Sequence, residues 1–156
     1  LDGHVHVHML PFLFPLAAKL GKEFSLSEIR ISREYYHFSL KESLGIGFVA
    51  NVAKHVLLNY FARSASRVAK EANLKSPDAI AGVLYSGRMT YNSARAAARA
   101  ARRVRLNWLE IVFHPGRATV EAAARWSRKP GSAKYITDTR RDVEKDVLFE
   151  IAKKGI

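Results

Sequence analysis

The chain has 156 residues, of which 48% are hydrophobic and 26% are charged, and it contains no cysteine. The length fits one domain and the composition is that of an ordinary globular protein, while no run approaches the roughly 18 apolar residues of a membrane span. The lack of cysteine excludes disulfides and thiolate ligands, so any metal must be held by nitrogen and oxygen groups. The net charge of +12 favours anionic partners such as nucleic acid, a membrane surface or a phosphorylated ligand.

The first eleven residues, LDGHVHVHMLP, contain three of the six histidines, at a spacing of two. Alternate side chains of an extended strand point to the same face, so this spacing predicts a strand that stops before Pro11, where a helix begins. The polar side chains that would share one face are those of Asp2, His4, His6 and His8.

Neutral imidazole is the commonest transition-metal ligand, and two histidines at i and i+2 on a strand can chelate one ion. Same-face neighbours lie about 6.6 Å apart along a strand, so only one or two of the four polar groups could bind the same ion directly. Three histidines in register with an aspartate therefore indicate a metal or catalytic site. The alternative is a surface strand whose histidines are satisfied by hydrogen bonds.

Two short elements follow the histidines. Apolar residues at steps of three and four predict a helix over 11–22. Alternation then predicts a strand over 28–32, with Arg30 on one face and Arg33 at its end. These two arginines could contact an anionic or polyhydroxyl substrate, and solvated salt bridges are an equal alternative.

The middle of the chain combines an irregular segment with the longest helix. Residues 35–46 have no regular pattern, and a broad apolar stripe then predicts a helix from 48 to about 72. His55 lies within it, and a lone histidine in a helix is expected to be structural. A short apolar run over 79–85 predicts a buried strand.

A helix rich in arginine is predicted from 93 to about 103, with Thr90 or Asn92 as its N-cap. Its basic side chains fall near one side at steps of three and four. We favour a solvated outer face with alanines packed inside, and the alternative is a surface for anions or lipid headgroups. The arginines concerned are Arg95, Arg99, Arg102 and Arg103.

The clearest strand covers 108–113 and runs directly into His114, with Glu110 on the same face. α/β folds place working residues at the carboxyl ends of strands, so we expect a functional His114, and the alternative is a histidine that stabilises the turn. Beyond it, 117–137 is expected to be a loop region with a helical turn near 120–126. A final amphipathic helix is predicted over 138–154.

Strands that alternate with helices predict an α/β fold with a mostly parallel sheet or part of a barrel. Four strands are too few to close a barrel of about eight. The start of the chain lacks the basic region of a signal peptide, so we expect a cytoplasmic protein, with association to a membrane surface left open.

Three segments resemble the YdjC-like family of carbohydrate deacetylases, which includes chito-oligosaccharide and hopanoid-associated branches. They are the histidine motif at 1–11, the sequence AGVLYSGRMT at 81–90, and IVFHPG at 111–116. The resemblance implies a deformed (β/α) barrel like that of polysaccharide deacetylases. It also implies one divalent metal ion, Mg²⁺ or Zn²⁺, and hydrolysis of an N-acetyl group on an amino sugar.

The resemblance assigns roles to several residues. It makes His4 a metal ligand and places His114 in the site. As our own mechanistic hypothesis, His114 could protonate the departing amine, with Glu110 orienting it. The remaining polar groups of the histidine motif, Asp2, His6 and His8, would contact substrate or support the ligands.

The family pattern also contains an Asp-Asp pair and a further histidine ligand, and neither is present in these 156 residues. We therefore expect the single domain 1–156 to be the C-terminal half of a deacetylase barrel that needs a missing N-terminal half or a partner chain, with a homodimer as another option. The alternative function is a truncated, non-catalytic module that binds anionic partners through its basic face. No nucleic-acid motif supports specific nucleic-acid binding.

Overall fold

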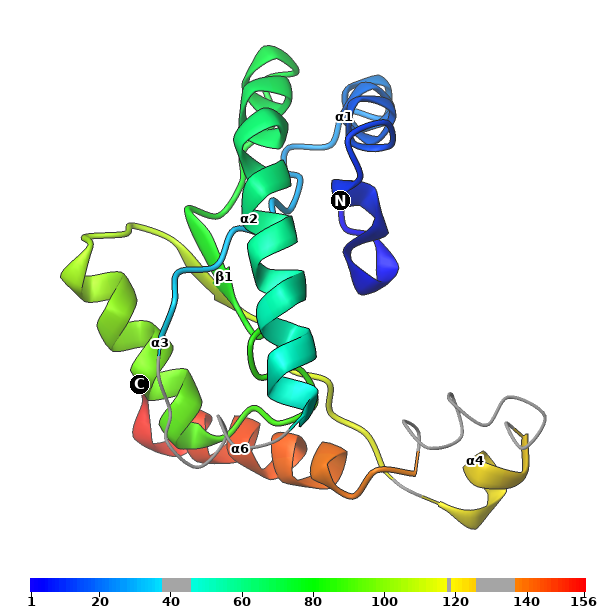
Figure 1. The fold of residues 1–156 in the computed structure, drawn as a ribbon, viewed down its shortest axis with the longest axis vertical. Helices are drawn as coiled ribbons and strands as arrows, with labels where there is room; N and C mark the ends of the chain where they lie inside the picture. Colours follow the sequence, from blue (N-terminus) through cyan, green and yellow to red (C-terminus); the bar gives the residue numbers. More distant parts are fainter. Residues whose placement is uncertain (38–45, 118, 126–136) are drawn as a thin grey trace.

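The computed structural model describes residues 1–37, 46–117, 119–125 and 137–156, and these form a mixed α/β structure with a small open sheet (Figure 1). None of its helices has the length and apolar character of a membrane span, within the described residues. The elements, in chain order, are the 3-10 helix η1 (His4–Met9), α1 (Phe14–Glu23), α2 (Ile46–Glu71), β1 (Ala79–Ala81), α3 (Tyr91–Arg103), β2 (Leu109–Ile111), α4 (Val120–Arg125) and α6 (Arg140–Lys154).

The sheet consists of β1 and β2, which pair in parallel with Ala79 opposite Leu109. Residues 28–33 run beside β1 without forming a regular strand. There the N–H of Ile29 donates to the carbonyl of Lys75 at 2.8 Å, and the N–H of Ile80 donates to that of Arg33 at 2.7 Å. The parallel arrangement agrees with the sequence prediction, whereas a barrel stays a prediction.

The predicted strand over 2–8 is wrong, because the histidines lie in the 3-10 helix η1. A strand needs a neighbouring strand to satisfy its N–H and C=O groups. Among the described residues, the backbone of η1 forms hydrogen bonds within its own turn instead. The N–H of His6 donates to the carbonyl of Gly3 at 3.0 Å, for example. Val5 and His6 have positive φ, at 47° and 63°, so the imidazoles do not share one strand face.

The predicted strand over 79–85 is also too long, since β1 stops at Ala81. Gly82 has φ of +137°, a conformation that glycine adopts readily. A Cβ there would lie 2.6 Å from the carbonyl oxygen of Val112. The chain therefore turns out of the sheet at Gly82. The expected strands over 28–32 and 108–113 are reduced to a single bridge at Glu28 and to β2.

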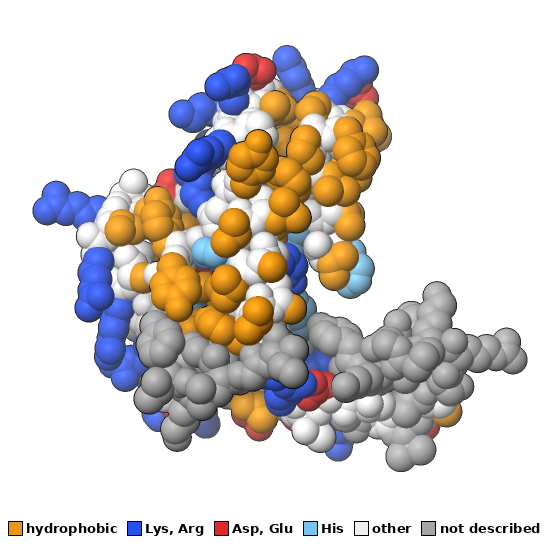
Figure 2. Space-filling view, viewed as in Figure 1, with side chains coloured by type: hydrophobic (Ala, Val, Ile, Leu, Met, Phe, Trp, Pro, Cys, Tyr) orange, Lys and Arg blue, Asp and Glu red, His pale blue; other side chains and the backbone are white. Residues whose placement is uncertain are grey.

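Helix α2 confirms the predicted long helix, but a different face makes its contacts. Two of the apolar residues that predict the helix are strongly exposed, Val49 at 69% and Tyr60 at 70%. The buried face follows steps of three and four through His55, Leu58, Ala62, Ala65 and Ala69. Figure 2 shows hydrophobic side chains exposed in a broad area over α1 and α2.

The helices near the carboxyl end match the sequence predictions. Thr90 caps α3 by accepting the N–H of Ser93. Ala94, Ala97 and Ala101 are buried, while the four arginines of this helix are exposed, as expected for a solvated basic face. α6 crosses the lower edge of the molecule beside α3 (Figure 1). α4 confirms the turn expected near 120–126, whereas 126–136 and 38–45 lie outside the described residues.

Candidate functional site

A chain of ion pairs joins three of the predicted site residues. The guanidinium of Arg30, on the extended segment beside β1, contacts the carboxylate of Asp2 and both oxygens of Glu110 on β2. Its Nε donates to Glu110 at 3.0 Å. Burial alone would lower the pKa of Arg30, but the pairing with the two carboxylates outweighs it and raises that pKa. Residues 80 positions apart in sequence are thereby held together, and Glu110 is engaged by an arginine.

Two histidines of η1 make structural contacts. His8 is 5% exposed. Its Nδ1 accepts the N–H of Gly3 at 3.0 Å, and its Nε2 lies 2.8 Å from the carbonyl of Arg30. These partners engage both ring nitrogens of His8, with Nδ1 as an acceptor and Nε2 placed to donate. His6 is hydrogen-bonded through Nδ1 to the hydroxyl of Ser32 at 2.7 Å.

Lys54, on α2, places a positive charge near His6. Burial, reinforced by Lys54, lowers the pKa of His6 to about 4. Burial also lowers the pKa of Lys54, against an opposing effect of Glu34. No pattern in the sequence marks this lysine, because it lies beside the apolar stripe rather than in a motif.

His114 lies three residues after the end of β2 and is half-buried. Burial lowers its pKa, and the nearby cations reinforce the effect. Its Nδ1 is buried and has no hydrogen-bond partner among the described residues. The groups that act on it come from four segments and are Lys54, Arg141, His4 and Arg30.

Two buried carboxylates that sequence reasoning missed fix the loops after β1 and β2. Glu34 accepts the N–H groups of Gly82, Val83 and Leu84, and it bonds His55 at 3.2 Å. Glu144, which is fully buried, accepts the N–H groups of Met89 and His114.

One sequence signal could have identified Glu144. It lies three residues before Val147, and therefore on the apolar stripe of the last helix, where a charge is expected only if it has partners. Glu34 carries no such signal, because its backbone partners lie 48 to 50 residues further along the chain.

The profile of the family described as YdjC-like protein matches residues 1–151. The chain belongs to the YdjC-like family. This family is related to the carbohydrate deacetylases. The match spans nearly the whole chain and includes all three segments on which the resemblance was based. No curated protein and no solved structure matches the chain.

The metal expected for a YdjC-like protein is not accommodated by the described residues alone. Among residues 1–37, 46–117, 119–125 and 137–156, no three histidine or carboxylate side chains gather closely enough to hold an ion. His4 is exposed, and no hydrogen bond engages it within that part of the chain. It is therefore available as one ligand, and the others would have to come from elsewhere.

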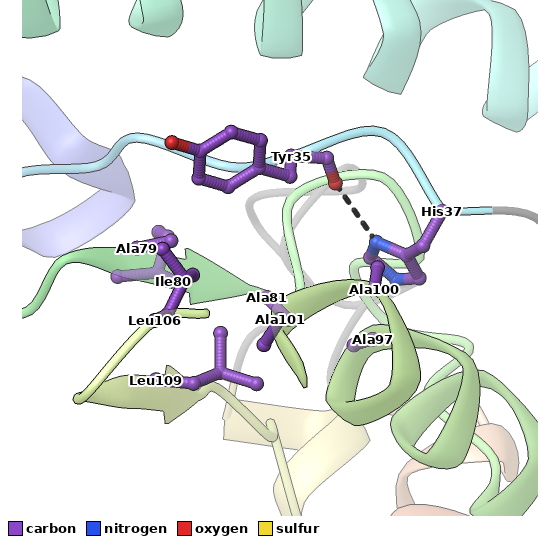
Figure 3. Close-up of a pocket in the computed structure, with 10 residues that line it drawn as sticks. All are labelled: Tyr35, His37, Ala79, Ile80, Ala81, Ala97, Ala100, Ala101, Leu106 and Leu109. Atoms are coloured by element: carbon purple, nitrogen blue, oxygen red, sulfur yellow. Dashed lines mark hydrogen bonds between the residues drawn. The ribbon is translucent and has the colours of Figure 1, made fainter. Parts of the chain in front are cut away.

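Two further features of this YdjC-like chain concern Arg33 and a small cavity beside the sheet. Arg33 donates to the hydroxyl of Ser66 on α2 at 2.7 Å, so its guanidinium is engaged by this helix. A cavity of about 10 Å³ lies beside β1 and α3, lined mainly by alanine and aliphatic side chains together with Tyr35 and His37 (Figure 3). Such a cavity holds about one water molecule and is too small for a sugar.

Proposed function

We propose that this chain supplies part of the active site of a carbohydrate N-deacetylase. The observation that carries the proposal is the relation between the family's two histidine motifs. Arg30 contacts both Asp2, in the first motif, and Glu110, on the strand that leads to His114. The charge of His4 also contributes to the lowered pKa of His114, behind the larger effect of burial. The proximity of the two motifs, together with the family match over residues 1–151, supports a shared site at the carboxyl end of β2.

The reaction is hydrolysis of the amide of an N-acetylated amino sugar. Water adds its oxygen to the acetyl carbon, the C–N bond breaks, and the amine leaves with a proton, so that acetate and a free amino sugar are formed. His114 would deliver this proton. A histidine whose pKa is lowered by burial is a strong acid once protonated, and such a group can assist a poor leaving group such as an amine.

A divalent ion, Mg²⁺ or Zn²⁺, belongs to the proposal through His4. Such an ion, if held by His4 and further ligands, would supply Lewis acidity toward the amide carbonyl and toward water. The described residues provide no complete site for it, so the other ligands and the general base would come from an N-terminal half or a partner chain. Asp2 and Glu110 hold Arg30 beside the site, where it could bind a hydroxyl or carbonyl oxygen of the sugar.

The experiment compares His4→Ala and His114→Gln in the complete protein, with chitobiose and longer N-acetylglucosamine oligomers as substrates. His4→Ala should reduce bound metal and acetate release by more than about tenfold, because loss of a ligand exceeds the 10–100-fold cost of losing a supporting contact. His114→Gln should keep the metal and lower kcat by about 10²–10⁴ with little change in KM. Arg99→Ala, on the exposed basic face of α3, is the control and should alter neither quantity.

Two results would count against the proposal. Unchanged metal content and unchanged acetate release in His4→Ala would remove His4 from the mechanism. Binding to anionic vesicles or nucleic acid that weakens steeply with salt, needs no metal and is impaired by Arg99→Ala would favour the non-catalytic basic module instead.

A further inference from the structure

Glu144 occupies an unusual place for an acidic residue of a surface helix. Its side chain is fully buried under α6, at the point where the chain segments after β1 and β2 come together. Within the part of the chain that the structure describes, no arginine or lysine forms a direct ion pair with it. Burial raises its pKa, and the backbone hydrogen bonds that it accepts act in the opposite direction. A carboxylate is retained in such a position only if its partners compensate for the loss of water.

The partners of Glu144 are the two loops that carry the family motifs. Its Oε1 accepts the N–H of Met89 at 3.1 Å, at the end of the Ser-Gly-Arg-Met-Thr segment. Its Oε2 accepts the backbone N–H of His114 itself. One carboxylate therefore ties the loop after β1 to the loop after β2.

The same carboxylate lies beside the imidazole of His114. Nδ1 of His114 is 3.9 Å from Oε2 of Glu144, about 1 Å more than a charge-assisted hydrogen bond requires. That Nδ1 is buried and has no partner among the described residues, and a carboxylate oxygen can accept a second hydrogen bond. Glu110, which the sequence suggested for this task, is engaged by Arg30 instead.

We propose that Glu144 is the positioning residue for His114: when the ring moves about 1 Å closer than the 3.9 Å in this structure, the carboxylate accepts the Nδ1–H of the imidazole and leaves Nε2 to face the substrate. The hydrogen bond fixes the tautomer and the orientation of the ring, as a carboxylate does for a catalytic histidine in other hydrolases. It also supplies the negative charge that an imidazolium needs among cations. The cationic groups that face His114 are Lys54 from α2, Arg141 from α6, His4 from η1 and Arg30 from the segment beside β1.

The first test reads the tautomer of His114 by ¹⁵N NMR of the imidazole in the unaltered protein at a pH where the ring is neutral. The proton is expected on Nδ1, whereas a proton on Nε2 would overturn the proposal. This measurement needs neither substrate nor metal. It therefore stands whether or not the proposed deacetylase activity, on which the role of His114 rests, is found.

The second test compares Glu144→Gln with Glu150→Gln, the same substitution on the same helix at an exposed glutamate paired with Lys154. Glu144→Gln should mix the two tautomers and lower the pKa of His114 by roughly one unit or more, because an opposite charge within 4–6 Å is removed. Glu150→Gln should change neither. A His114 pKa and tautomer that are the same in both variants would contradict the proposal.

The third readout is kinetic and distinguishes positioning from simple structural support. In the complete enzyme, Glu144→Gln should lower kcat tenfold or more and shift the pH profile while KM stays within about twofold, and Glu144→Asp should restore part of the loss. Equal losses in Glu144→Asp and Glu144→Gln with an unshifted pH profile would contradict the proposal. If Glu144→Gln does not fold, the tautomer of the unaltered protein decides the question.

Discussion

The buried carboxylate of Glu34 allows the sharpest prediction about stability. Oε1 accepts the N–H of Gly82 at 2.6 Å and that of Val83 at 3.2 Å. Oε2 accepts the N–H of Leu84 at 2.9 Å and is bonded to His55 at 3.2 Å. Both oxygens are therefore fully engaged inside the protein. Glu34→Gln keeps the size and shape of the side chain and replaces one of these acceptors by a donor.

The cost of Glu34→Gln follows from this geometry. If the amide oxygen stays on Gly82 and Val83, the amide nitrogen faces the N–H of Leu84, which then lacks an acceptor. A buried N–H without a partner costs about 1–3 kcal/mol, and the two remaining bonds each lose about 1 kcal/mol with the charge. The free energy of unfolding should therefore fall by roughly 3–5 kcal/mol, a large part of the 5–15 kcal/mol typical of a domain.

The assay is urea unfolding followed by circular dichroism, with Glu28→Gln as the matched control. Glu28 is exposed, and no described side chain bonds to it, so its substitution should stay within about 0.5 kcal/mol. With a slope of about 1–3 kcal/mol per molar urea, Glu34→Gln should lower the midpoint by about 1 M or more. A midpoint equal to that of the control would refute the account of Glu34 as the acceptor for this turn.

Three further predictions concern single groups. Thr90→Ala should lower the free energy of unfolding by about 0.5–2 kcal/mol, because it removes the N-cap of α3. Thr139→Ala is the control and should lower it less, because the side chain of Thr139 makes no cap hydrogen bond. Equal urea midpoints for the two variants would contradict this prediction. Gly82→Ala should destabilise the protein far more than Gly87→Ala. Both glycines have positive φ, so the backbone strain is similar, but only at Gly82 would the new Cβ collide with a backbone oxygen. Similar thermal midpoints for the two variants would contradict the steric argument. The pKa of His6 is lowered from 6.5 to about 4, so the unfolded chain binds its proton first as the pH falls. Stability should be complete above about pH 6.5 and decline towards pH 4 by roughly 1–3 kcal/mol, because partial exposure of the ring screens part of the effect. In His6→Asn this decline should be smaller, and an identical pH dependence would exclude His6 as its source.

The sequence predicted the helices well, because helical periodicity is a local property. The long α2 and the capped α3 were both found from spacing and end signals. The contact face of α2 was not found. Its buried face at Leu58, Ala62 and Ala65 consists mostly of small residues, while larger apolar side chains such as Val49 and Tyr60 are exposed. Burial depends on what lies opposite a helix, which a pattern within the helix does not contain.

The strands were predicted less well, because a strand exists only through its neighbours. The alternation of His4, His6 and His8 fits a strand, yet these residues bond locally and form a 3-10 helix. Likewise, the apolar run that begins at Ala79 stays in the sheet only until Gly82, where a carboxylate far away in sequence takes over the backbone N–H groups.

The sequence predicted some of the contacts among the candidate site residues, but it did not predict the buried groups that support them. His114 was expected at the carboxyl end of a strand and lies there, and Arg30, Asp2 and Glu110 are brought together. Strand alternation does not indicate which carboxylate would position His114. Alternation places Glu110 on the same face, and it says nothing about a helix that packs from outside the sheet.

Glu34 and Glu144 solve the same physical problem at two adjacent places. β1 and β2 are only three residues long each, so strand pairing alone fixes little of the backbone that follows them. Each loop leaves the sheet with buried N–H groups that need acceptors, and in each case one buried carboxylate provides them. An anion rather than a carbonyl is suited to this task here, because a cation acts on each carboxylate: Lys54 on Glu34 and Arg141 on Glu144. The shape of the two loops therefore depends on two acidic residues that lie outside the three segments 1–11, 81–90 and 111–116.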